Sequence, residues 1–169
     1  MHFVVKRRSS MPNKYLKPIY SKLFHESFSY DAFEKRLKMQ KGIYLLEELG
    51  VDVGDFAFGW YKHGPYSQRL QDEMFWANSM SESEIKFSQF AQENIEKISK
   101  CLADKHEGYT DSQWAECLAS LYYLKKNVLP SSCKDQDVVC KLQELKPHLN
   151  NKILNNNALD LISDIYGLK

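Results

Sequence analysis

Among the residues of this chain that could do chemistry, His63 has the most promising neighbours. It lies beside a Gly-Pro turn in the segment YKHGPYS (61–67), but no serine or cysteine accompanies it in the pattern of a nucleophile with its base. Ser67 begins a stretch with helical periodicity, so we interpret it as a helix cap and not as a nucleophile. The sequence therefore predicts no catalytic residue, and we expect that the protein is not an enzyme.

Metal-binding patterns are missing from the sequence in the same way. The remaining histidines are scattered and show no ligand spacing: His2, His25, His106 and His148. The cysteines include no pair with the short spacing of a zinc site or of a redox Cys-x-x-Cys motif: Cys101, Cys117, Cys133 and Cys140. We therefore expect neither a metal nor a cofactor. Cys101 and Cys117 fall on apolar helical faces, so we expect them to be buried thiols.

The composition bounds the class of protein. Of the 169 residues, 43% are hydrophobic and 27% are charged, which is ordinary for one globular domain. The net charge of +1 gives no general attraction to nucleic acid or to acidic membranes. Residues 1–12 are basic and rich in serine, which predicts a flexible arm, and their apolar run is too short for a signal peptide. Because no segment is apolar enough to span a bilayer, we expect a cytoplasmic protein without a membrane partner.

A central helix over residues 32–49 is the element that must position the turn. Asp31 and Glu34 have the spacing of a capping box at its start, and Gly50 fits its end. No charge occurs between Gly42 and Leu46, which predicts that this half of the helix is enclosed on nearly all sides. The inward stripe has helical spacing: Phe33, Leu37, Gln40 and Tyr44.

The turn itself lies between an aromatic run and the next helix. Phe56, Phe58 and Trp60 alternate with other residues, which predicts a short strand or hairpin near residues 55–61. Pro65 fixes the turn, and a helix over 66–78 follows with its apolar stripe at Leu70, Met74 and Ala77.

The other segments are helical by periodicity, with residues 81–87 left open between a helix start and an extended arm. Their predicted ranges are 14–27 (Tyr15 inward), 88–104, 112–128 (Asp111 as cap, Val128 inward), 135–145 and 151–166. The fold class is therefore mainly α: a single compact domain over 13–169, with about six to seven helices and one short strand or hairpin.

The order KMQKGIYLLEELG (38–50), an aromatic strand and YKHGPYSQRL (61–70) resembles the signature of the Panacea family of antitoxin-associated domains, and of related uncharacterised bacterial proteins. Most matching positions lie on the helix and the turn: Leu37, Gln40, Lys41, Tyr44, Leu45, Trp60, Tyr61, Gly64, Pro65, Tyr66, Ser67 and Leu70. The segment from Trp114 to Lys126 and the Lys146-Pro147 junction match more loosely. Met39 and Gly42 depart from the larger aliphatics usual in the family.

The resemblance implies a helical domain that often neutralises an unrelated toxin. We therefore predict a non-enzymatic protein-binding module, similar to antitoxins of toxin–antitoxin systems, that neutralises or adapts a partner protein. Because Tyr and Trp dominate binding energy at interfaces, the partner-binding residues are predicted around the strand and the turn. They are Trp60, Tyr61, His63, Tyr66 and Arg69.

Gln40 and Lys41, the polar residues of the signature on the helix, also have a structural interpretation. A buried Gln40 amide without hydrogen bonds would cost about 1–3 kcal/mol, and the backbone of residues 64–67 is its nearest candidate partner. Gln40 and Lys41 are therefore predicted to brace the turn, although the same turn could present a recognition surface.

Two further alternatives remain at this stage. A winged-helix-like DNA-binding regulator would use the basic run Lys35, Arg36 and Lys38, but the apolar helix that carries it is poorly suited to enter a groove. The N-terminus of the helix over 66–78 could instead bind an anion, with cationic side chains nearby. Those side chains are Lys41, Lys62, His63 and Arg69.

Overall fold

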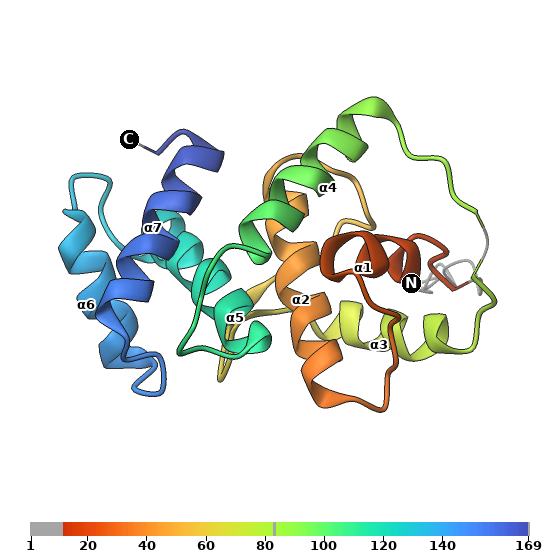
Figure 1. The fold of residues 1–169 in the computed structure, drawn as a ribbon, viewed down its shortest axis with the longest axis horizontal. Coiled ribbons are helices and arrows are strands. Elements are labelled where there is room, and N and C mark those ends of the chain that lie inside the picture. The colour runs from red at the N-terminus through yellow and green to blue at the C-terminus, as the bar shows by residue number, and fades with distance from the viewer. Residues whose placement is uncertain (1–11, 83, 169) are drawn as a thin grey trace, which may run out of the picture.

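The computed structural model of the chain describes residues 12–82 and 84–168. Two helices lie at the centre of the fold. Helix α2 (Phe33–Glu48) packs against helix α5 (Asp111–Tyr123) in the middle of the molecule (Figure 1). The helices around α2 are α1 (Leu16–Phe24), α3 (Gln68–Asn78) and α4 (Gln89–Leu102). On the other side of α5 lie α6 (Asp135–Leu145) and α7 (Lys152–Tyr166). The prediction of a mainly α fold is confirmed.

Helix α2 is enclosed as its charge-free run predicted. Every residue from Leu37 to Leu46 is buried. Gly42 allows α1 to approach closely, because a Cβ at this position would lie 2.7 Å from Leu23 Cδ1. The packing of α1 on α2 therefore favours a residue without a side chain at position 42.

The start of α2 differs from the prediction. Ala32 occupies the N-cap without a side-chain hydrogen bond, so the capping box of Asp31 and Glu34 is wrong. Glu34 instead accepts a hydrogen bond from Ser112 on α5. Phe33 was placed on the inward stripe, but half of its surface is exposed, because the first turn of α2 extends beyond the core.

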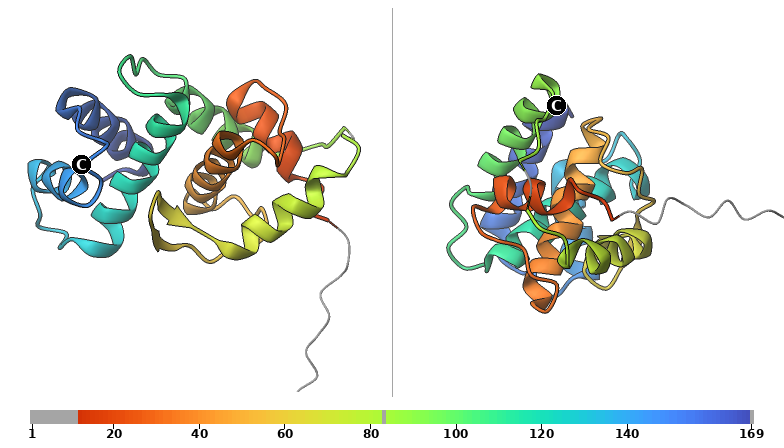
Figure 2. Two further views of the ribbon diagram at one scale, coloured as in Figure 1. Left: turned by 90° about the horizontal axis from the view of Figure 1, so that it is seen from below. Right: turned by 90° about the vertical axis from the view of Figure 1, so that its right-hand side faces the viewer.

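The turn region is an antiparallel hairpin of β1 (Gly59–Tyr61) and β2 (Gly64–Tyr66), in which Trp60 lies opposite Pro65. The hairpin was predicted near residues 55–61, but its first strand begins only at Gly59. Helix α3 begins at Gln68 and not at Tyr66, because residues 64–66 pair as a strand. Ser67 caps α3 as predicted, with its Oγ accepting from the Leu70 N–H at 3.2 Å. Figure 2 shows the hairpin beside the N-terminal end of α3.

Helix α5 begins and ends differently from the predicted 112–128 helix. Its N-cap is Thr110, which forms a capping box with Gln113, so the prediction of Asp111 as the cap is wrong. The helix continues as a π-helix, η1 (Leu124–Val128). Because a π-turn changes the angular spacing of side chains, the predicted inward position of Val128 is wrong, and this residue is exposed.

The remaining elements lie close to their predicted ranges. Helix α1 is shorter than 14–27 because His25 adopts a left-handed conformation (φ 54°), and Tyr15 is exposed instead of inward. Among residues 81–87, those that the structure describes are not helical. Cys101 and Cys117 are buried free thiols, as predicted. Of the predicted flexible arm over 1–12, residues 1–11 lie outside the described residues.

The C-terminal helix docks firmly on the core. Its Leu154, Ala158, Leu159 and Ile162 are buried, and α7 lies along both α5 and α6. The Tyr166 hydroxyl donates a hydrogen bond to the Leu45 carbonyl of α2 at 2.5 Å. Within residues 12–82 and 84–168, no helix has both the length and the apolar character needed to cross a bilayer.

Candidate functional site

The junction of the hairpin with α3 is braced from α2. Gln40 Oε1 accepts from the Ser67 N–H at 2.9 Å, and Gln40 Nε2 donates to the Ser67 carbonyl at 2.9 Å. Lys41 Nζ donates to the Pro65 carbonyl at 2.6 Å. All four residues are buried. The prediction that Gln40 and Lys41 brace the turn is confirmed.

Lys41 is an unusual cation for such a position, because its side chain is enclosed completely. Burial lowers the pKa of Lys41 to about 7, since the charged ammonium loses its water. The negative charge of Glu116 raises the pKa of Lys41, and the positive charge of Lys146 lowers it. Lys41 therefore lies in the electric field of a carboxylate from α5 and of a second lysine from the loop after α6.

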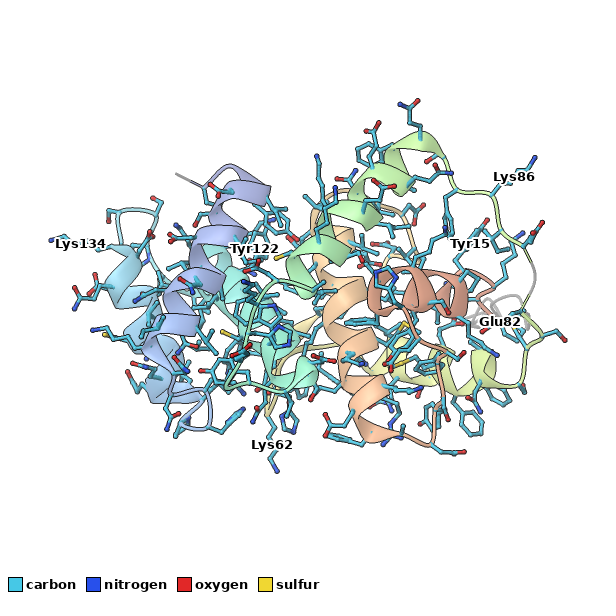
Figure 3. All side chains as sticks on the ribbon, viewed as in Figure 1. Tyr15, Lys62, Glu82, Lys86, Tyr122 and Lys134 are labelled. Atoms are coloured by element: carbon cyan, nitrogen blue, oxygen red, sulfur yellow. The ribbon has the colours of Figure 1, made fainter. Side chains whose placement is uncertain are left out.

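This second lysine holds the other side of the hairpin. Lys146 Nζ donates to the Tyr61 carbonyl at 2.7 Å and to the Lys62 carbonyl, and it lies 4.7 Å from the centre of the Trp60 ring. Burial lowers the pKa of Lys146, and Glu116 opposes that shift. The hairpin is thus tied to α2 through Lys41 and to the C-terminal part through Lys146. Figure 3 shows the side chain of Lys62 projecting away from the molecule at this hairpin.

A cavity of about 310 Å³ lies between α2, the hairpin and α3. Its exposed rim includes Tyr61 and Phe33, with 57% and 50% of their surfaces exposed. The Tyr61 and Tyr66 rings meet edge to face at 5.1 Å. The full lining is Phe33, Arg36, Leu37, Gln40, Lys41, Tyr61, Lys62, His63, Tyr66 and Gln71. We call this cavity with its aromatic rim the hairpin cavity.

The structure brings three of the five predicted partner-binding residues to the hairpin cavity: Tyr61, His63 and Tyr66. Trp60 is half-buried instead, with its ring 5.5 Å from that of Tyr123. Arg69 donates from Nη1 to the Asp55 carbonyl at 3.1 Å and lies over a phenylalanine ring. Trp60 and Arg69 therefore do not line the cavity.

The residues predicted to be structural are all buried: Leu37, Gln40, Lys41, Tyr44, Gly64, Pro65, Ser67, Leu70 and Trp114. Trp114 donates from its indole N–H to the Cys101 carbonyl at 3.0 Å, which ties α5 to α4. At Gly64 the backbone is left-handed (φ +81°), and a Cβ would lie 2.2 Å from Ser120 Oγ. The left-handed backbone favours glycine at this position, and any larger residue would also displace the Ser120 hydroxyl.

The basic run at the start of α2 is occupied by local contacts. Lys35 and Arg36 donate to the backbone carbonyls of Ser27 and Tyr30. Lys38 is buried, pairs with Glu26 and lies over the Phe24 ring. These three side chains bind the loop before α2. The residues named for an anion site also contact separate groups, since Lys41 is bound to Pro65 and Arg69 to Asp55.

The structure also forms a cluster around Glu116 that was not predicted from the sequence, and the side chain of Glu116 is only 2% exposed. Its Oε2 lies 3.4 Å from His63 Nδ1, and its Oε1 lies 3.0 Å from His148 Nε2. One ligand atom from each of the three side chains lies within 4.8 Å of the others. The residues come from the hairpin, α5 and the loop after α6, so no local spacing connects them. The one sequence signal is an acidic residue inside the apolar stretch WAECLASLYYL.

Comparison of the chain with protein-family models, with curated proteins and with solved structures finds no match.

Proposed function

We propose that this chain is a protein-binding module, similar in action to an antitoxin, that covers a surface of a partner protein. The observation that carries the proposal is the hairpin cavity with its exposed aromatic rim. Its volume of about 310 Å³ is at the lower end of small-molecule sites, and suits one or two inserted side chains of a partner. Tyrosine is among the residue types that contribute most to binding at interfaces, and the cavity has the exposed Tyr61 and the half-buried Tyr66 at its edge.

The bracing of the hairpin supports this proposal. A surface that is rigid before binding loses little conformational entropy when the partner arrives. Gln40, Lys41 and Lys146 fix the backbone of the hairpin through buried hydrogen bonds. Tyr61 and Tyr66 are therefore presented from a fixed support and not from a mobile loop. The partner would be a protein, such as a toxin, in the cytoplasm, where free thiols such as those of this chain persist.

A co-expression experiment tests the proposal. A candidate toxin, encoded beside this chain, is produced together with it, and growth rescue and co-purification are measured. Replacing Tyr61 and Tyr66 together with alanine is expected to abolish both, and Phe33→Ala to weaken them. Ile153→Ala removes an exposed apolar side chain on α7 that does not line the hairpin cavity, and is the matched control.

The fold of each variant is checked by thermal melting. Loss of the Tyr61–Tyr66 ring contact removes about 0.5–1.5 kcal/mol, which leaves a cooperative transition. If the double variant melts cooperatively and still binds and rescues, the hairpin cavity is not the binding surface.

Binding to DNA as a regulator has weaker support. A recognition surface needs cations that are free to reach phosphates, whereas Lys35, Arg36 and Lys38 are engaged within the protein. Salt-dependent binding to duplex DNA that is lost on replacement of these three residues would favour the regulator instead.

A further inference from the structure

The cluster of His63, Glu116 and His148 has the composition of a metal site. Two imidazoles and one carboxylate are the protein ligands of many zinc centres, in which a fourth position is open to water or to another ligand. This is the one group of three such side chains that converges within residues 12–82 and 84–168. Glu116 also faces the ammonium groups of Lys41 and Lys146, whose pKa values it raises, so a bound ion would share this carboxylate with two lysines.

The distances within the cluster fit a shared ion. Two ligands of a tetrahedral zinc, at bonds of about 2.0–2.1 Å, lie about 3.3–3.4 Å apart. The 3.4 Å between His63 Nδ1 and Glu116 Oε2 meets this spacing. His148 Nε2 lies 3.0 Å from the other carboxylate oxygen, Oε1, and the three ligand atoms lie within 4.8 Å of one another. The His148 ring would have to adjust to complete the site, and its exposed position permits that movement.

His63 Nδ1 supplies the second observation. This atom is buried and lies close to the carboxylate, but it has no hydrogen-bond partner among the residues that the structure describes. A buried imidazole nitrogen without a partner costs about 1–3 kcal/mol, and a bond to a metal would satisfy it. His63 Nδ1 and Glu116 Oε2 are thus as far apart as two ligands of one zinc ion, but they do not form a hydrogen bond.

The surroundings hold the ligands in place and leave a path to them. Lys146 binds the carbonyls of Tyr61 and Lys62, and Lys41 binds the carbonyl of Pro65, so the backbone on both sides of His63 is fixed. Glu116 is on the rigid helix α5. The side chains of His63 and His148 are 33% and 40% exposed, which allows an ion to enter and a fourth ligand to bind.

We propose that His63, Glu116 and His148 bind one divalent transition-metal ion, with zinc as the best fit. Imidazole nitrogens favour zinc and its neighbours in the first transition row over magnesium or calcium, which take oxygen ligands. Because His63 also lines the hairpin cavity, the ion lies at the edge of the proposed partner surface. The site stands whether or not the chain acts on a toxin, since it depends on the three side chains alone.

The experiment is a zinc titration of the full chain in competition with a fluorescent chelator. The expected result is one zinc ion per chain, with no competition from a large excess of magnesium or calcium. His63→Ala, His148→Ala and Glu116→Gln are each expected to weaken binding by at least about tenfold. In parallel, zinc should raise the melting temperature of the wild-type chain and not that of the double variant H63A/H148A.

Two matched controls separate this site from incidental binding. His25→Asn removes a histidine at a left-handed position that asparagine tolerates, and is expected to leave the affinity unchanged. Cys133→Ser with Cys140→Ser removes the two accessible thiols and should also leave it unchanged. The proposal is overturned if micromolar zinc does not bind, if H63A/H148A binds as tightly as wild type, or if the cysteine variant alone abolishes binding. Circular dichroism of each variant confirms that a loss of affinity is not a loss of fold.

Discussion

Replacement of Gln40 by methionine measures how much the brace between α2 and the hairpin contributes to stability. Methionine has a similar volume and no amide, so Gln40→Met removes both hydrogen bonds to Ser67 without leaving a large cavity. The Ser67 N–H then has no other partner in the buried interior. The Ser67 carbonyl is less affected, because it also accepts from the Gln71 N–H at 3.1 Å.

The expected magnitude follows from these two groups. A buried N–H without a partner costs about 1–3 kcal/mol, and a carbonyl that keeps one of its two bonds costs about 1 kcal/mol or less. Gln40→Met should therefore lower the free energy of unfolding by about 2–3 kcal/mol. Urea denaturation followed by circular dichroism gives this quantity, with an unchanged m-value as the sign that the unfolded state is the same.

Gln68→Met is the matched control. Gln68 is exposed on α3, and its side chain bonds to Asp72 and to the Tyr66 hydroxyl on the surface. Gln68→Met should therefore change the free energy of unfolding by no more than about 0.5 kcal/mol. If the two variants unfold at the same urea concentration, the amide of Gln40 does not support the turn, and the reasoning about the brace is wrong.

The remaining predictions concern Lys41 and Gly64. Between pH 7 and 10 the Lys41 side chain is deprotonated in the folded protein but protonated in the unfolded chain. The free energy of unfolding of wild type, compared with that of Lys41→Met, should therefore rise by about 1 kcal/mol per pH unit over this range. Below pH 7 Lys41 is protonated in both states, so the difference in free energy of unfolding between wild type and Lys41→Met should be constant. The measurement is urea denaturation of both proteins from pH 6 to 9 in the presence of a metal chelator. If the two free energies change with pH in parallel over the whole range, the pKa of Lys41 is not lowered. Gly64→Ala should destabilise by about 2 kcal/mol or more through its left-handed backbone and Ser120. Adding Ser120→Ala should recover part of that loss in thermal melts, and no recovery would exclude the clash.

The parts of the site that follow from local pattern could be predicted from the sequence. Gln40 was recognisable because an amide lies on an otherwise apolar helical stripe, and such a group must find a partner. The turn was recognisable from Gly64 and Pro65. Its contact with α2 was predicted because the Gln40 amide needs a hydrogen-bond partner and the backbone of residues 64–67 is the nearest candidate. Ser67 as the cap of α3 follows from the same local chemistry.

The parts that depend on distant segments could not be predicted. The Lys146-Pro147 junction was noted only as a loose match to the family signature, without a role, because the two bonds of Lys146 to the hairpin exist only where α6 ends beside the turn. Glu34 has the spacing of a capping residue, but Ser112 on α5 offers it a competing hydrogen bond. Glu116 gave one weak signal, and its two histidines could not be assigned to it without the packing of α5 against the hairpin.

The tether from Lys146 has a consequence for synthesis on the ribosome. The hairpin and the helix that follows it emerge early, but the ammonium group that secures the carbonyls of Tyr61 and Lys62 is added more than 80 residues later. A nascent chain that ends before Lys146 contains α2 and the hairpin but lacks the hydrogen bonds that join the hairpin to the C-terminal part of the fold. The backbone that presents Tyr61 therefore reaches its final set of hydrogen bonds only after α6 and Lys146 have been translated.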